Sequence, residues 1–384
     1  MNWRILALLL LIGLTLLFGI SLYEPANGGA LSAHTRVETP PQDIGGFTRA
    51  IEPWDWRFPR DHGAHPNFQT EWWYYTGVAA TAEGRLFGFQ FTIFRRAITP
   101  LAQPSSSEFR ASDIFMAHFT VSDIQSGDFY HDVRYARGGA GLAGAEVDPF
   151  YRVWLEDWQV SALDDNANKT HITAASEAYA IDLHLYQMKK PALHGAGGLS
   201  PKSAEIGNAS YYYSLTRLLT EGAITIGDET YNVSGFSWMD HEFSTSALGD
   251  DAQGWDWFGL IFDDNTELMV GQIRQVDGGV EPTFGGLYVD ADGDARYLDA
   301  AAFTIAVADS WRSPHSDAEY PAGWEISVKG DQGFHIRVAP LQADQELRSA
   351  DIVYWEGAVE ISGDKTGYGY AELTGYVGSM QNRF

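Results

Sequence analysis

The strongest constraint on the fold is a recurring pattern of short aromatic segments that alternate with a period of two. Residues 71–79 (EWWYYTGVA) and 85–95 (RLFGFQFTIFR) show it most clearly, and the short Gly-containing connection between them predicts a hairpin. Similar segments return along the chain as far as residue 376, separated by turns rich in Gly, Asp and Asn. No long segment with a 3.6-residue period follows residue 24, so the sequence predicts an all-β protein.

The predicted strands fall into two groups on either side of residues 244–251. The first predicted domain covers residues 49–245 and the second covers residues 246–384. Each contains enough segments for a barrel or sandwich of about eight to ten strands, a size that can enclose one small ligand. We therefore expect two consecutive antiparallel β-barrel or sandwich domains.

The chain carries a large negative charge and no cysteine. Its 384 residues include 51 Asp and Glu against 25 Lys and Arg, which gives a net charge of −26. A nucleic-acid partner is not expected, because binding phosphates requires a cationic surface. The lack of Cys excludes disulfides, thiol nucleophiles, Fe–S clusters and Cys-based zinc sites.

An apolar segment opens the chain. Residues 5–23 carry no charge and follow Arg4. This length fits either a long signal peptide or a single membrane anchor, so residues 1–24 are predicted to be one or the other, followed by a linker at residues 25–48. The positive flank should stay inside, which predicts an exported protein of the periplasm or cell envelope, held at the inner membrane if the segment is uncleaved. Nucleotide cofactors are scarce there, and we expect no cofactor.

A carboxylate interrupts the aromatic strand at residues 69–77 (QTEWWYYTG). With a period of two, Glu71 shares a face with Trp73 and Tyr75. A carboxylate in such surroundings is costly unless it is paired or functional. Glu71 is therefore either a structural residue at the rim of the strand or a candidate acid, with Trp73 and Tyr75 as candidate ligand contacts.

The segment 237–244 (SWMDHEFS) holds the least expected polar cluster of the chain. Trp238, Asp240 and Glu242 share one face of the predicted strand. An acid among aromatic residues has a raised pKa, so Asp240 is the candidate proton donor. His241 and Glu242 are the candidates for positioning water or taking the proton back. The alternative is a satisfied polar network that ties the two domains together.

Further aromatic residues are candidates for lining a pocket. Tyr211 and Tyr213 share one face of a predicted strand, and the segment GWDWF contributes Trp255 and Trp257. Aromatic faces can bury an apolar ligand and can stabilise a cation. The alternative for each is ordinary core packing.

Neither a metal site nor a serine hydrolase is predicted. Strand alternation lets only Asp240 and Glu242 share a face, and the two histidines of residues 62–65 (HGAH) are too few ligands by themselves. Residues 235–239 (GFSWM) do not match the Gly-x-Ser-x-Gly nucleophile motif.

Six aromatic segments stand out together. They are residues 71–77 (EWWYYTG), 208–214 (NASYYYS), 237–243 (SWMDHEF), 254–258 (GWDWF), 354–357 (YWEG) and 372–376 (ELTGY). With them the chain resembles the AttH/carotenoid 1,2-hydratase-like family of secreted lipocalin-like proteins, from about residue 50 to its end. The resemblance implies two consecutive lipocalin-like (calycin-type) antiparallel β-barrel domains. Some AttH-like members are linked with ABC-transporter permeases.

The resemblance also implies a chemistry. Carotenoid hydratases add water to an isolated double bond, and relatives in natural-product pathways shape polyene cyclisations. Their proposed acid lies in a strand similar to residues 238–240 (WMD), which implies the donor role for Asp240. Upstream, those hydratases have a His-x-Trp pair where this chain has residues 211–213 (YYY), a departure that argues against carotenoid hydration itself.

Two hypotheses follow. In the first, the protein is a cofactor-independent hydratase, cyclase or isomerase of a lipophilic, polyene- or terpenoid-like molecule, in which Asp240 protonates a double bond. Trp238, Tyr211 and Tyr213 then stabilise the resulting cation. In the second, the same aromatic barrel carries a lipid or lipoprotein for an ABC-type envelope transporter. The ligand is expected in the first barrel and at the domain junction, and a cavity common to Asp240 and Glu71 would support the first hypothesis.

Overall fold

The computed structural model describes residues 45–100, 107, 111–245, 248–249, 251–330 and 333–380, all of which belong to one compact unit. The predicted signal peptide or anchor (1–24) and residues 25–44 of the predicted linker lie outside the described residues. Among the described residues, no helix has the length and hydrophobicity needed to cross a membrane.

Thirteen of the described strands form an antiparallel sheet in the first half of the chain, with the main order β4-β3-β2-β1-β13-β12-β9-β8-β7-β6-β5. The two short strands β10 and β11 pair with β12. The bounds are β1 (Thr70–Ala80), β2 (Leu86–Ala97), β3 (Asp113–Asp123), β4 (Asp128–Arg137), β5 (Ala143–Glu146), β6 (Arg152–Leu155), β7 (Trp158–Ala162), β8 (Lys169–Ala175), β9 (Tyr179–Gln187), β10 (Ala192–Leu193), β11 (Leu199–Pro201), β12 (Ala209–Ile226) and β13 (Glu229–Ser244). A single 3₁₀ turn, η1 (Arg60–His62), precedes them in the described part of the chain.

Ten of the described strands form a second antiparallel sheet, with the main order β17-β16-β15-β14-β23-β22-β20-β19-β18 and β21 paired with β22. The bounds are β14 (Ala252–Phe262), β15 (Glu267–Gln275), β16 (Gly286–Val289), β17 (Ala295–Leu298), β18 (Phe303–Arg312), β19 (Glu319–Val328), β20 (Phe334–Pro340), β21 (Glu346–Arg348), β22 (Val353–Gly363) and β23 (Gly367–Leu373).

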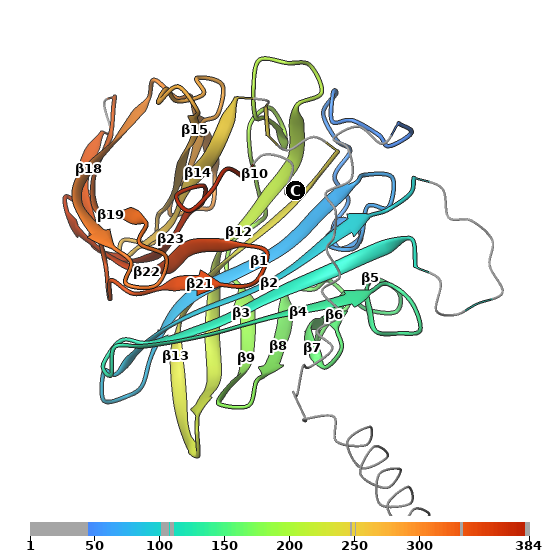
Figure 1. Ribbon diagram of the computed structural model, residues 1–384, viewed down its shortest axis with the longest axis horizontal. Helices are drawn as coiled ribbons and strands as arrows, with labels where there is room; N and C mark the ends of the chain where they lie inside the picture. Colours follow the sequence, from blue (N-terminus) through green and yellow to red (C-terminus); the bar gives the residue numbers. More distant parts are fainter. Residues whose placement is uncertain are drawn as a thin grey trace, which may run out of the picture. The chain divides into compact units, whose positions relative to one another are not determined.

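Both sheets are curled, as Figure 1 shows, and each packs around its own hydrophobic core, while a third core lies where the sheets meet. Strands β1 and β2 of the first sheet contact β23 and β22 of the second, and β12 contacts β14. The central strands of the first sheet are therefore buried on both faces, which explains their nearly continuous apolar and aromatic sequences. The predicted fold class, two lipocalin-like all-β halves, is confirmed.

Two details differ from the expectation. The first sheet has thirteen described strands rather than eight to ten, because short edge strands such as β10 and β11 add to it. The segment 151–163, one of the segments that alternate with a period of two, is not a single strand but the hairpin β6–β7, which turns at Glu156 in the left-handed region (φ 56°). The chain passes from the first sheet to the second between Ser244 and Ala252. The described residues pack as one unit, so the division into two domains stays a prediction.

Candidate functional site

The register of β1, β12 and β13 decides which side chains share a face. Tyr74 of β1 pairs with Asp240 of β13, and Asp240 pairs in turn with Ser214 of β12. Because side chains alternate along a strand, these three point to the face that packs against the second sheet. Tyr213 and His241, each one position away, point into the core of the first sheet.

Asp240 is fully buried and has no basic partner among the described residues. Its Oδ1 accepts hydrogen bonds from Ser214 Oγ (2.5 Å) and Trp238 Nε1 (2.6 Å), and its Oδ2 accepts one from the Tyr212 hydroxyl (2.6 Å). Burial outweighs these bonds and raises the pKa of Asp240 to about 7. Two donors fill the lone pairs of Oδ1, whereas Oδ2 keeps one position in which an acidic hydrogen fits. Asp240 can therefore hold and release a proton near neutral pH.

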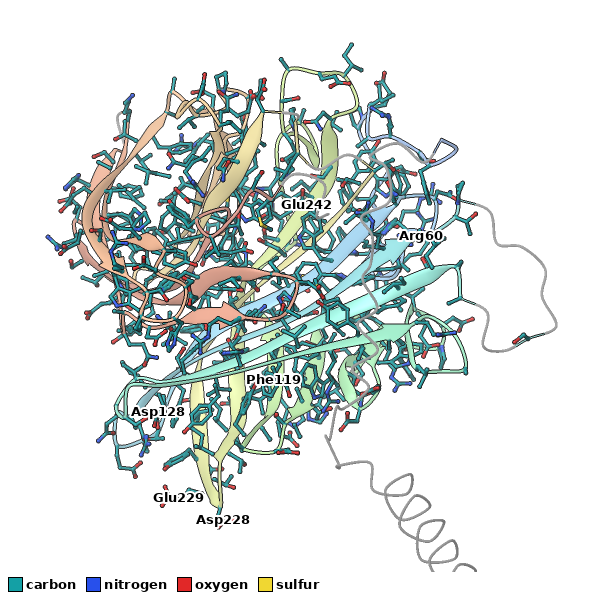
Figure 2. All side chains as sticks on the ribbon, viewed as in Figure 1. Arg60, Phe119, Asp128, Asp228, Glu229 and Glu242 are labelled. Carbon is teal, nitrogen blue, oxygen red and sulfur yellow. The ribbon has the colours of Figure 1, made fainter. Side chains whose placement is uncertain are left out.

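Asp240 lines a cavity of about 90 Å³ between the two sheets. The full lining is Trp72, Tyr74, Phe94, Lys202, Tyr212, Asp240, Glu242, Leu248, Trp255, Asp256, Trp257, Ile273, Phe284 and Glu372. Figure 2 shows Glu242 of this wall in the region between the sheets. A second cavity of about 340 Å³ lies farther along β1 and β13, and Trp238, the donor to Asp240, lines it. The acid thus lies close to two spaces between the sheets.

Basic residues do not balance all the acids of the cavity wall. Lys202 Nζ lies 2.6 Å from Glu242 Oε1, and the two groups form an ion pair without the angles of a hydrogen bond. Asp256 is paired with an arginine of β15 at 3.0 Å. Among the described residues, no ion pair reaches Asp240 or Glu372, so these carboxyls face the aromatic wall without a compensating cation.

Glu372 has a close acidic neighbour in the second sheet. It accepts a hydrogen bond from Trp255 Nε1 (2.9 Å) and pairs across strands with Glu356. Neither carboxyl oxygen of Glu356 has a donor at hydrogen-bonding geometry, although the phenols of Tyr74 and Tyr354 are neighbours. Burial raises the pKa of Glu372 to about 7. Nearby acids raise this pKa further, and the hydrogen bond from Trp255 lowers it. Burial and the adjacent Glu372 raise the pKa of Glu356 well above its usual range.

These raised pKa values predict a stability that falls as pH rises. A folded-state Glu372 with a pKa of about 7 keeps its proton between pH 5 and 7, where the unfolded side chain has lost it. Stability from this group is therefore present at low pH and lost as pH rises through about 7. We expect urea denaturation at pH 5 and pH 8 to show that Glu372→Gln loses about 3 kcal/mol less over this interval than the wild type. The exposed Glu360→Gln is the control, and equal slopes for wild type and Glu372→Gln would contradict the prediction.

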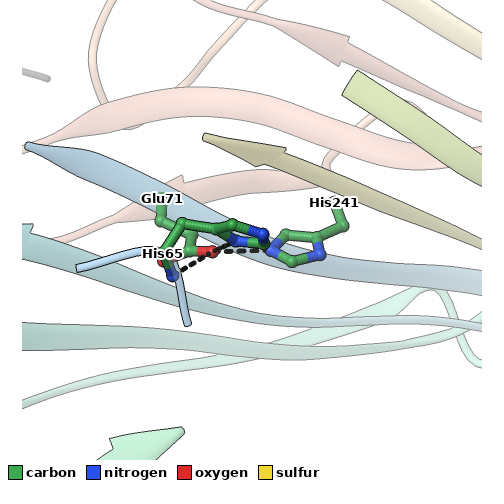
Figure 3. A group of neighbouring side chains, drawn as sticks. All are labelled: His65, Glu71 and His241. Atoms are coloured by element: carbon green, nitrogen blue, oxygen red, sulfur yellow. Dashed lines mark hydrogen bonds and ion pairs between the residues drawn. The ribbon is translucent and has the colours of Figure 1, made fainter. Parts of the chain in front are cut away.

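Glu71 occupies the opposite face, inside the first sheet (Figure 3). His65 Nδ1 and His241 Nε2 lie 2.7 and 2.9 Å from its Oε1. Arg95 Nε donates to Oε2 (3.0 Å), and so does the backbone N–H of His65 (2.9 Å). Burial acts to raise the pKa of Glu71, but the charges of His65 and Arg95 outweigh it and hold this pKa well below its usual range. The surroundings of Glu71 are those of an ionised carboxylate that ties together β1, β2, β13 and the loop after η1.

The cluster extends through Tyr213, whose hydroxyl lies 3.0 Å from His241 Nδ1 and 2.6 Å from His62 Nδ1. Burial lowers the pKa of His62 to about 3, so this histidine is neutral. His65, Glu71 and His241 present ligand atoms within 4.8 Å of one another, a spacing that could hold a metal ion. Since protein donors already surround both oxygens of Glu71, the cluster is satisfied as it stands.

The structure divides the predicted site residues between the two faces of the first sheet. Those at the cavity between the sheets are Asp240, Glu242, Trp255 and Trp257, with Trp238 bonded to Asp240. Those on the opposite face are Glu71, Trp73, Tyr75, Tyr211, Tyr213 and His241. Asp240 and Glu71 therefore do not share a cavity, and His241, Tyr75, Tyr211 and Tyr213 cannot reach a ligand beside Asp240.

Sequence reasoning missed ten of the fourteen residues that line the cavity, among them Lys202, Tyr212 and Glu372, and it also missed Glu356, the cross-strand neighbour of Glu372. The alternation of side chains along a strand places Tyr212 on the opposite face from Tyr211 and Tyr213, and this could have identified it. Each of the two glutamates comes two positions after an aromatic residue of its own strand, the same pattern that Asp240 shows with Trp238. Lys202 comes from a Gly-rich loop and carries no such signal.

A family model described as AttH-like matches residues 49–376. The chain belongs to the AttH-like family. The crystal structure of an AttH protein from Nitrosomonas europaea is 33% identical, with a TM-score of 0.76, and the match covers 86% of this chain and 100% of that one. No curated protein matches the chain in sequence.

The AttH-like chain also shares its fold with a hydratase. Kievitone hydratase from Nectria haematococca has a TM-score of 0.64, and the match covers 88% of this chain and 99% of the hydratase. The two sequences are 13% identical, so the likeness concerns the fold alone. The resemblance inferred from the aromatic segments is confirmed at the level of family and fold.

Proposed function

We propose that this AttH-like protein binds a lipophilic molecule between its two sheets and protonates it through Asp240. The reaction class is that of a cofactor-independent hydratase, cyclase or isomerase acting on a polyene- or terpenoid-like compound. The single observation that carries the proposal is Asp240 itself, a buried acid without a cationic partner whose pKa is about 7 and which lines an aromatic cavity. A carboxyl kept neutral by burial is suited to donate a proton near neutral pH.

The proton transfer can be written from the contacts of Asp240. The π electrons of a carbon–carbon double bond take the hydrogen from Oδ2, and the adjacent carbon becomes a cation. Aromatic faces of the cavity, such as those of Trp257 and Tyr212, stabilise this cation. Water then adds to the cation and its surplus proton returns to Asp240, which gives net hydration. Loss of a different proton to Asp240 instead gives isomerisation.

The hydrogen bonds around Asp240 fix its orientation. Ser214 Oγ donates to Oδ1 and lies 2.7 Å from His194 Nε2, and the His194 ring stacks on Tyr212 with centroids 3.6 Å apart. Burial lowers the pKa of His194 well below its usual range, so the ring is neutral and its Nε2–H can donate to Ser214. We assign Ser214 and His194 as positioning residues. Glu242 is the residue of the cavity wall placed to orient water.

A second candidate function is a carrier without catalysis. It is favoured by the three donors that already satisfy Asp240, because a fully hydrogen-bonded carboxyl can be a structural element of an apolar binding site. In that case the protein would hand a lipid or lipoprotein to an ABC-type envelope transporter. For either function we propose export to the cell envelope, on the strength of the apolar segment at residues 5–23.

Filling the cavity tests where the ligand binds. Leu248 lines the cavity from the chain between the two sheets, so Leu248→Trp is expected to occupy the ligand's space. We expect solvent extraction and mass spectrometry of protein purified from its own host to show an apolar compound with wild type and at least a tenfold loss with Leu248→Trp. Val276→Trp is the control, because Val276 is 64% exposed and outside the cavity. Equal amounts of compound in both variants would place the ligand elsewhere.

A further inference from the structure

An ammonium group already lies against the cavity wall. Lys202 Nζ is 4.8 Å from the ring centroid of Phe284 and 5.1 Å from that of Tyr212, and its charge is paired with Glu242. This arrangement combines a carboxylate with two aromatic faces, which is the environment that proteins use to bind organic cations. The side chain shows that the chemistry of this wall accommodates a positive nitrogen.

The wall holds further carboxyls that no cation of the protein uses. Asp240 and Glu372 line the cavity without an ion pair, and Glu356, which is not part of the lining, lies beside Glu372 with the phenols of Tyr74 and Tyr354 as its polar neighbours. A buried carboxyl without a cationic partner is costly in its ionised form, so a ligand that brings a positive charge would stabilise that form.

The spacing of these carboxyls favours a cation larger than a metal ion. In the described part of the chain, two groups of His, Asp and Glu converge closely enough to hold a metal, and neither includes Asp240, Glu356 or Glu372. Separated carboxyls among Trp and Tyr faces instead match a diffuse charge spread over several carbon atoms. A tertiary or quaternary ammonium has this form.

From this geometry we propose that the cavity between the sheets binds an organic ammonium ion that carries an apolar body. The inference rests on the proposed function, because it names the ligand class of the same cavity. It also gives the acids a common purpose. The same carboxyls and rings that hold an ammonium stabilise a carbon cation formed after protonation, since both are bulky and positively charged.

Proton release should accompany binding of the ammonium. Burial raises the pKa values of Glu372 and Glu356 and so favours their protonated forms, whereas a bound cation favours their ionised forms. Affinity for the ammonium should therefore increase as pH rises. The titratable and charged groups that face these carboxyls are Tyr74, Lys202, Tyr212, Asp240, Glu242, Tyr354 and Tyr370, with Asp256 and Arg274 at the same wall.

The test compares two probes of the same shape, benzyltrimethylammonium and its neutral isostere neopentylbenzene. Binding to the full chain is followed by tryptophan fluorescence, because Trp255 and Trp257 line the cavity. We expect the ammonium to bind at least about tenfold more tightly than the isostere at pH 8, and this preference to shrink at pH 6. In Glu372→Gln we expect the preference to fall below about threefold, whereas Glu360→Gln on the exposed side of β22 keeps it.

Equal affinities of the two probes, or binding of neither, would overturn the inference. Binding of both probes with equal affinity would leave the lipophilic site of the proposed function in place. The protein could also prefer the ammonium probe while its Asp240→Asn variant converts the natural ligand as wild type does. That result would support the inference and rule out catalysis by Asp240. Failure of the inference and failure of the proposed function are therefore distinguishable.

Discussion

Asp240→Asn is expected to lower the rate of ligand conversion by about 10²–10⁴-fold, the contribution typical of a positioned general acid. The asparagine keeps the shape of the side chain, and its oxygen can still accept from Ser214 and Trp238. It has no acidic hydrogen to give. Affinity for the unconverted ligand should therefore stay within about threefold of wild type, so that the loss appears in kcat rather than in KM.

The control for this variant is Asp228→Asn. Asp228 lies at the exposed tip of the same β12–β13 hairpin, and Figure 2 shows it at the other end of the molecule from Glu242 of the cavity wall, so its replacement should leave the rate unchanged. The assay uses the compound that accumulates on the Asp240→Asn variant in its own host. Conversion at the wild-type rate by Asp240→Asn would rule out Asp240 as the donor.

Glu71→Gln is expected to have the largest effect on stability. The substitution leaves the buried Arg95 and His65 without their common carboxylate, and the Arg95 guanidinium also holds the carbonyls of His65 and Phe68 (both 2.9 Å). Breaking a buried ion pair by removing one partner typically costs about 3–5 kcal/mol.

Urea denaturation measures this loss directly. Glu83→Gln, at the exposed turn between β1 and β2, should stay within about 0.5 kcal/mol of wild type. Equal stability of Glu71→Gln and Glu83→Gln would contradict the prediction, because the contacts in Figure 3 would then not stabilise the packing of the loop on the sheet.

The period of two along the chain was enough to predict the fold class and the face that each side chain shares with its strand neighbours. It separated Tyr212 from Tyr211 and Tyr213, and it placed Asp240 with Trp238 and Glu242. These are local properties of a strand and need no knowledge of the partner strand.

The pairing of strands distant in sequence was not accessible in the same way. Whether Glu71 and Asp240 share a face depends on the register of β1 against β13, whose residues lie about 170 positions apart. The structure pairs Tyr74 with Asp240, which sends Glu71 to the other side. The histidine at position 65 likewise joins Glu71 only because the chain around η1 folds back onto the sheet.

The chemistry of the second sheet was hidden for a similar reason. In the sequence, Glu356 and Glu372 each appear as a single acid two positions after a tyrosine. Their proximity to each other follows from the β22–β23 register, and the proximity of Glu372 to Asp240 follows from the packing of the two sheets. The unbalanced charge of the cavity is therefore a tertiary property.

The most direct test of proton transfer by Asp240 uses deuterium oxide. The apolar compound extracted from Asp240→Asn protein is incubated in deuterium oxide with purified wild type or with the variant, and the products are analysed by mass spectrometry. We expect the wild-type product to carry deuterium on carbon, with or without added water, and the variant to leave the compound unchanged. Recovery of the compound unchanged from wild type, with no deuterium on carbon, would contradict catalysis and leave a carrier.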